Sequence, residues 1–148
     1  IIEKYGFPTV EKFGKEANEA AWLVIQHSIS KPEFMKKCAA LLEKAVTENQ
    51  AAAKHLAYLT DRIAVFEDRA QLYGTQFDWD ENGEMNPKPF DELEKVNERR
   101  KSVGLNSLQE QTEIIRKQII AENQKTPADR HERTKQADEW RKKVGWVK

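Results

Sequence analysis

The sequence is poor in cysteine and histidine, which limits the covalent and metal chemistry open to it. Its 148 residues include one cysteine, Cys38, and three histidines. A single cysteine excludes a disulfide within the chain, and so few soft ligands argue against a four-ligand structural zinc site. We therefore expect no metal and no cofactor. The lone thiol fits a reducing compartment, so we expect a cytoplasmic protein.

The sequence also lacks a net charge and a long apolar run. Its 25 Lys and Arg residues balance 25 Asp and Glu residues, so no overall field attracts nucleic acid or an anionic membrane. The apolar run at residues 20–25 is far too short to cross a bilayer. These absences predict one soluble domain whose main partner is neither a nucleic acid nor a membrane.

The sequence does contain long stretches of helical periodicity. Apolar residues recur at intervals of three and four over residues 10–27 and 51–66, and again in the stretch between them. This spacing predicts three helices, of which we expect the second and third to pack antiparallel. In the first, we expect a stripe that includes Val10, Phe13 and Val24 to face the core.

Start signals mark several of the expected helices. Residues 30–33 and residues 107–110 both match a capping box, in which a Ser hydroxyl and a Glu carboxylate each satisfy a free backbone N–H. A helix is also expected from Asp91, and another after Thr126, where a proline follows at a favourable first position. The sequence thus predicts about five or six helices.

From residue 71 the pattern changes to the alternation of a strand. Asn82 and Gly83 then predict a hairpin with a type I′ turn, because both of its central positions need a positive φ. Pro87 and Pro89 keep the returning strand short, since neither can donate a hydrogen bond to a sheet. We expect a single short β-hairpin that needs helices behind it.

Together these elements predict a mainly α fold, with about five or six helices in antiparallel pairs and one short β-hairpin. We expect residues 1–125 to form a single helical domain, with the hairpin near residues 71–90. Residues 126–148 are rich in charge and carry few apolar residues. They predict a charged C-terminal helical arm.

Asp61 and Arg62 are adjacent in the third expected helix. Neighbouring helical residues point about 100 degrees apart, so the two side chains cannot pair with each other. An unpaired buried charge costs several kcal/mol, so each side chain needs another partner. One interpretation is a structural network that ties the helix to the hairpin. The other is an arginine that holds a carboxylate or phosphate beside an Asp that acts as a base or orients one.

Gln26 and His27 end the first expected helix. The negative end of a helix dipole favours a protonated imidazole, which tunes a histidine without making it catalytic. The structural alternative is that His27 bonds a free carbonyl at the end of its helix.

The segment from Tyr73 to Gln76 is small and polar where a strand is usually apolar. Gly74 permits close approach of a backbone or a ligand, and Gln76 offers both a donor and an acceptor. The structural alternative is a strand twisted by a bulge at Gly74, with the glutamine bonded to the ribbon backbone.

Three motifs occur in the order WLVIQH at residues 22–27, YLTDR at residues 58–62 and QLYGTQ at residues 71–76. This series resembles a bacterial family known only as a domain of unknown function. The resemblance covers roughly residues 1–110, and the tail after about Lys125 has no counterpart in it. It implies one shared site made of these residues: Gln26, His27, Asp61, Arg62, Tyr73, Gly74, Thr75 and Gln76.

The leading hypothesis is a pocket between the end of the first helix, the third helix and the hairpin. It would bind a small polar or anionic molecule and, in its enzymatic form, act as a hydrolase or transferase. In that form His27 and Asp61 are the catalytic residues, one as general acid or base and the other as base or orienting group. The ligand would be bound by the remaining residues: Gln26, Arg62, Tyr73, Gly74, Thr75 and Gln76.

The alternative hypothesis is an interaction module of the immunity or adaptor type, with no catalytic activity. Exposed Trp79, Trp140 and Trp146 would then contact a protein partner. The burial of these tryptophans distinguishes the two hypotheses, because a partner surface needs them exposed together. The sequence names no substrate for either.

Overall fold

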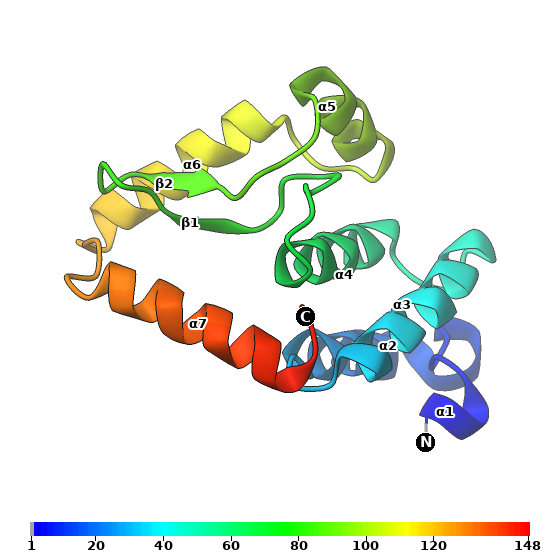
Figure 1. The fold of residues 1–148 in the computed structure, drawn as a ribbon. Helices are drawn as coiled ribbons and strands as arrows, with labels where there is room; N and C mark the ends of the chain where they lie inside the picture. Colours follow the sequence, from blue (N-terminus) through cyan, green and yellow to red (C-terminus); the bar gives the residue numbers. More distant parts are fainter. Residues whose placement is uncertain (1) are drawn as a thin grey trace.

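The computed structural model describes residues 2–148 as a mainly α fold with one two-stranded antiparallel sheet, which confirms the predicted fold class (Figure 1). No helix among these residues combines the length and apolarity needed to cross a bilayer. The elements in chain order are α1 (Ile2–Tyr5), α2 (Val10–His27), α3 (Pro32–Thr47), α4 (Ala53–Phe66), β1 (Phe77–Trp79), β2 (Met85–Pro87), α5 (Leu93–Ser102), α6 (Leu108–Ala121) and α7 (Arg130–Val144).

Helix α2 has the predicted bounds. The apolar stripe that we expected to face the core is exposed instead. Gly14 interrupts the helix with a φ of 83° and a ψ of 167°, so Val10 and Phe13 belong to a separate turn. These two side chains are 42% and 55% exposed, and Val24 is 63% exposed. Ile25 and Gln26 are buried instead. The expectation was wrong because spacing identifies a stripe, whereas contact with other helices decides which side is covered.

The two predicted capping boxes have different outcomes. At α6 the box forms, with Ser107 Oγ accepting from Glu110 N at 3.2 Å and Ser107 N donating to Glu110 Oε2 at 3.0 Å. At α3 it does not, because the helix begins one residue later than the box requires. Lys31 is the N-cap residue and has no side-chain capping bond, and Pro32 occupies the first turn. The pre-set φ of Pro32 suits this position without a cap.

The β-hairpin pairs Phe77–Trp79 with Met85–Pro87. Its turn is not the predicted type I′, because Gly83 has a φ of 77° while Asn82 keeps a negative φ. Asp80 holds the turn instead: its Oδ1 accepts from Asn82 N at 2.8 Å and from Glu84 N at 2.9 Å. A carboxylate that satisfies two backbone N–H groups of the loop stabilises a turn that needs only one left-handed residue.

The core lies among α2, α3 and α4 and also takes in the C-terminal end of the chain. Ile25, Met35 and Leu42 are fully buried there. Trp146 is only 6% exposed, stacks on Phe66 with ring centroids 4.9 Å apart, and donates from Nε1 to Ile29 O at 2.7 Å. The predicted C-terminal arm is helical, but its end is part of the core. Trp146 is therefore not the exposed partner contact that we expected.

Figure 1 shows how the halves of the chain meet. Helices α5 and α6 and the hairpin lie on one side of α4, and helices α2 and α3 lie on the other. Helix α7 runs below the hairpin and returns the chain to the α2–α3 end. Helix α4 therefore has one side toward the hairpin and another toward α2.

Candidate ligand-binding site

Asp61 is fully buried on α4 and organises the loop that follows it. Its Oδ1 accepts from Leu72 N at 2.8 Å and from Tyr73 N at 3.1 Å. Its Oδ2 accepts from Thr75 N and from Thr75 Oγ1, both at 2.9 Å. Burial raises the pKa of Asp61, while these hydrogen bonds lower it. Both carboxylate oxygens are therefore occupied, and the loop is tied to the helix.

Arg100 of α5 holds the same loop from the other side. Its side chain is buried, and its Nη1 donates to Tyr73 O at 2.8 Å. Nε and Nη2 donate to the backbone and side-chain oxygens of Asn106 at 2.6 and 3.0 Å. Burial lowers the pKa of Arg100, and the nearby Tyr58 and Asp61 raise it. The loop is thus clamped between two buried groups of opposite charge.

Gln71 and Gln76 complete this internal network. Gln71 is fully buried, and its Nε2 donates to Gln76 O at 3.0 Å and to Lys88 O at 2.9 Å. Its Oε1 accepts from Gln76 N at 2.7 Å, and Gln76 Nε2 donates to Thr75 Oγ1 at 3.1 Å. These bonds match the structural interpretation of the segment, in which its polar side chains satisfy backbone groups. They also explain why the strand begins only at Phe77.

Gly74 packs against the start of α6. It has a φ of 64°, and a Cβ atom there would lie 2.8 Å from Leu108 Cδ1. Both the backbone conformation and the contact require glycine. The close approach that the sequence predicted at Gly74 is therefore to a leucine of the protein.

The structure separates Gln26 and His27. His27 is exposed, and its Nδ1 lies 2.7 Å from Leu23 O, one turn earlier in the same helix. Gln26 is buried; with its amide oxygen turned toward α4, it accepts from Trp22 Nε1 at 3.2 Å and from Leu59 N at 3.3 Å. The catalytic roles of His27 and Asp61 stay predictions, and the bonds of both residues fit the structural alternative.

Arg62 differs from the other predicted site residues because it has no partner. Its half-buried guanidinium makes neither a hydrogen bond nor an ion pair within residues 2–148, and its Nε is buried. Burial lowers the pKa of Arg62, since the charged form loses solvation. A buried polar group left unbonded is rare in proteins and calls for an explanation.

Two aromatic residues, His55 and Tyr58, are on the same side of α4 as Arg62 by their helical spacing. His55 stacks on Trp22 with ring centroids 4.1 Å apart, and Tyr58 meets the same indole edge-on at 6.4 Å. The Nδ1 atom of His55 is buried and has no partner in the described part of the chain. Burial, followed by the charge of Lys54, lowers the pKa of His55, whereas Glu19 raises it.

We call His55, Tyr58 and Arg62 the α4 polar face. Their spacing of three and four places them on one side of the helix. That spacing is visible in the sequence, but it gave no reason to assign His55 and Tyr58 to the site. Trp22 and Gln26 of α2 border this face. No group of three or more His, Cys, Asp or Glu among the described residues is placed to hold a metal ion.

The match to known families covers most of the chain. A family model matches residues 1–123, which include the α4 polar face and the clamped loop. The chain belongs to the DUF6624 family. That family is described as one of unknown function, which confirms the predicted membership of an uncharacterised family and names no ligand. Searches of curated proteins and of solved structures found no match. Helix α7 lies beyond the DUF6624 match.

Proposed function

We propose that this DUF6624 protein binds a small anionic molecule at the α4 polar face, with Arg62 as the counter-charge. The observation that carries the proposal is the half-buried guanidinium of Arg62, which has no partner among residues 2–148. A carboxylate or phosphate would supply the missing acceptor, because its oxygens match the planar fork of an arginine.

Neighbouring groups favour a polar ligand of small size. The Tyr58 hydroxyl can donate and accept, and the buried Nδ1 of His55 is a second unused polar atom. Trp22 adds an apolar wall next to both rings. The clamped loop is tied to α4 through Asp61, so the face is presented by a helix that is held in place.

The proposal is limited to binding. Both oxygens of Asp61, the predicted base, already accept hydrogen bonds from the loop. The interaction module is not favoured in its predicted form, because Trp146 is buried and Trp79 and Trp140 are half-buried. The unpartnered guanidinium of Arg62 therefore favours a small ligand over a tryptophan-mediated partner surface.

The proposal is tested by titrating the protein with inorganic phosphate and with citrate while following the indole N–H signals in ¹H–¹⁵N spectra. We expect a saturable shift of the Trp22 signal, because Trp22 contacts both aromatic residues of the α4 polar face. Arg62→Gln should weaken binding about tenfold or more, the expected loss for a hydrogen bond to a charged group.

Lys44→Gln is the matched control. It removes one positive charge from an exposed position of α3 that pairs with Glu48 at 4.0 Å. Its affinity should stay within about twofold of the wild type, since exposed ion pairs contribute little. Equal affinities of the Arg62 variant and the wild type would exclude the α4 polar face as the site.

A further inference from the structure

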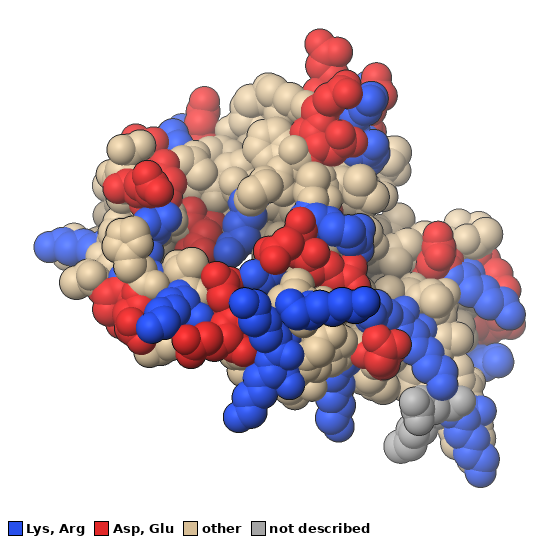
Figure 2. All heavy atoms as spheres, in the orientation of Figure 1, with Lys and Arg blue, Asp and Glu red and all other residues tan. Residues whose placement is uncertain are grey.

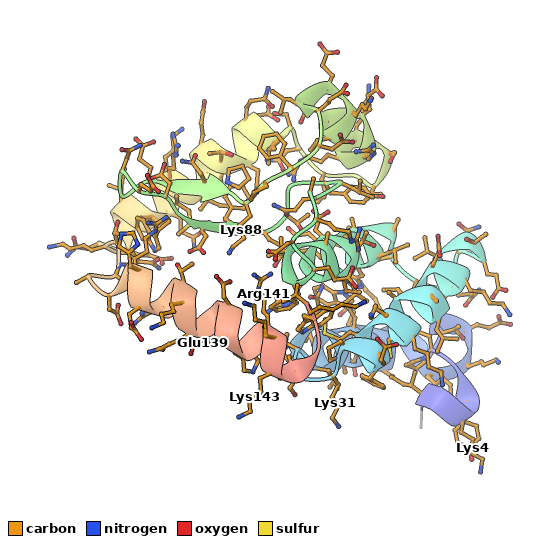
Figure 3. The ribbon with its side chains drawn as sticks, viewed as in Figure 1. Lys4, Lys31, Lys88, Glu139, Arg141 and Lys143 are labelled. Carbon is orange, nitrogen blue, oxygen red and sulfur yellow. The ribbon has the colours of Figure 1, made fainter. Side chains whose placement is uncertain are left out.

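A second site is suggested by the cleft between α7, the hairpin and the C-terminal end of α4. We call it the α7 cleft. Its volume is about 580 Å³, within the usual range for small-molecule sites. Lys88 and Arg141 face this space from opposite sides, while Glu139 and Lys143 of α7 point away from it (Figure 3).

Aromatic side chains form the apolar part of the α7 cleft. Trp79 of β1 and Trp140 of α7 both line it, and both are half-buried. Phe66, at the end of α4, meets Trp140 with ring centroids 5.8 Å apart and an interplanar angle of 59°. Indole rings on two sides of a cleft offer flat apolar surface to a planar ring, which aromatic pairs favour in stacked or edge-on geometry.

Basic side chains outnumber acidic ones around the α7 cleft. Figure 2 shows Lys and Arg intermixed with Asp and Glu along this face of the molecule. Five basic and three acidic residues line the cleft: Arg69, Lys88, Arg130, Arg133 and Arg141, with Asp68, Asp78 and Asp138. Because both signs of charge are present, an anion needs a cation of the cleft that has no carboxylate partner.

Most of these cations are already paired. Arg141 donates to Asp68 Oδ1 at 2.6 Å and to Asp138 Oδ1 at 2.8 Å, and Lys88 Nζ lies 3.1 Å from Asp78 Oδ2. Arg69 and Arg133 also have carboxylate partners. The Arg141–Asp68 pair joins α7 to the segment after α4, and the other pairs are local. These cations therefore have little capacity left for a ligand.

Arg130 is the exception among the cations of the α7 cleft. Its Nε donates to Trp79 O at 2.9 Å, which fixes the guanidinium next to one of the indoles. Within residues 2–148 it has no carboxylate partner, and neither of its terminal nitrogens makes a hydrogen bond. Two terminal N–H groups held in a planar fork are suited to a bidentate bond with a carboxylate or phosphate.

We infer that the α7 cleft binds a small molecule made of a planar ring and one anionic group. The anion pairs with Arg130, and the ring lies against Trp79 and Trp140. This site goes beyond the proposed function, because it shares no residue with the α4 polar face. It also depends on α7, which lies outside the DUF6624 match, so it belongs to this chain and not to the matched region.

The test uses indole-3-acetate and adenosine monophosphate, which join a ring to a carboxylate and to a phosphate. Indole and acetate supply the two halves of the first probe, and adenosine and inorganic phosphate supply those of the second. One of the joined probes should shift the Trp79 and Trp140 indole N–H signals saturably, and about tenfold more tightly than either half. Which probe binds distinguishes a carboxylate from a phosphate ligand. Trp→Phe variants assign the four signals.

Two internal reporters make the readout site-specific. Trp146 Nε1 is bonded to Ile29 O in the core, so its signal should stay in place. A shift of Trp22 alone would report the α4 polar face and would count against the α7 cleft. Binding at one site can therefore fail while binding at the other is observed.

Arg130→Gln should weaken binding of the joined probe about tenfold, which is the loss expected for a hydrogen bond to a charged group. Lys135→Gln is the control, since it removes one charge from an exposed position of α7 that does not line the cleft. The Lys135→Gln variant should bind the joined probe as tightly as the wild type does. The Arg62→Gln variant should do the same. The inference is overturned if neither joined probe moves Trp79 or Trp140 at millimolar concentration, or if Arg130→Gln binds as tightly as the wild type.

Discussion

At the scale of single residues, Asp61 and Arg62 show how a helix directs two neighbouring side chains to different sides. Asp61 points toward the loop and accepts four hydrogen bonds, whereas Arg62 points toward the side bordered by α2 and makes none within residues 2–148. The same motif thus supplies a structural anchor and the group proposed to bind a ligand. Their separation follows from the angle of about 100 degrees between adjacent helical residues.

Asp61→Asn should lower the free energy of unfolding by about 3 kcal/mol. One of the two oxygens becomes an NH₂ group facing N–H donors, so buried donors lose their acceptor. Urea denaturation followed by circular dichroism measures the change.

Asp129→Asn is the comparison for this substitution, because Asp129 is exposed and forms an ion pair with Arg133 at 2.9 Å. Its cost should stay below about 1 kcal/mol. If Asp61→Asn also lowers the free energy of unfolding by less than about 1 kcal/mol, the loop does not depend on the carboxylate.

At the scale of elements, the loop from residue 72 to residue 75 has no regular secondary structure, yet it is the most constrained connection in the site. Asp61 holds its N–H groups, Arg100 holds its carbonyls and Leu108 covers Gly74. The loop in turn joins three helices, because Asp61 is in α4, Arg100 is in α5 and Leu108 is in α6. A change in its backbone should therefore weaken contacts between helices.

Gly74→Ala should cost about 2–3 kcal/mol of unfolding free energy, combining a left-handed backbone with the clash against Leu108. Gly104→Ala carries only the first effect, because nothing lies within 4 Å of a Cβ atom there, and should cost about 1 kcal/mol. Chemical denaturation of both variants checks the difference.

A double variant separates the two causes. In a Leu108→Ala background the clash is relieved, so the added cost of Gly74→Ala should fall to that of Gly104→Ala. An unchanged cost would assign the whole effect to backbone conformation.

At the scale of the whole molecule, α7 is held at both ends. Arg130 bonds to β1 at its start, and Arg141 bonds to Phe66 O at 3.0 Å near its end. Trp146 then inserts into the core beside Ile29. The helix has little apolar surface of its own, so these contacts at its ends position it and thereby form the α7 cleft.

Trp146→Ala should lower the free energy of unfolding by about 3–4 kcal/mol, because it removes a large buried side chain and its hydrogen bond. Trp140→Ala should cost clearly less, since Trp140 is half-buried. Hydrogen exchange gives a second readout. The amides of α7 should exchange with the global unfolding free energy in the wild type and much faster in Trp146→Ala; rapid exchange in the wild type would show that α7 is an independent arm.

Much of the fold could be predicted from local patterns. The bounds of α2, the capping box of α6 and the hairpin follow from spacing, capping and turn residues that act over a few positions. The failures have local causes too. A proline start replaced the box at residues 30–33, and Asp80 stabilised a turn that the Asn82–Gly83 pair alone did not indicate.

The site was less predictable than the fold. The sequence singled out Asp61 and Arg62, but it left open which was structural, because the answer depends on what lies across from each side chain. Arg100 was not assigned to the site, since nothing in its charged helix marks it as buried. Trp146 was expected to be exposed because its own segment is charged, whereas its partners Phe66 and Ile29 lie far earlier in the chain.

The sequence by itself determined the secondary structure, the balance of charge and the set of polar groups beside apolar stripes, because these depend on near neighbours along the chain. Only the tertiary structure decided that one face of α2 is uncovered, that Asp61 is saturated while Arg62 is not, and that α7 closes a cleft against the hairpin. Burial and hydrogen bonding between distant segments set these outcomes, and no local pattern encodes which segments meet.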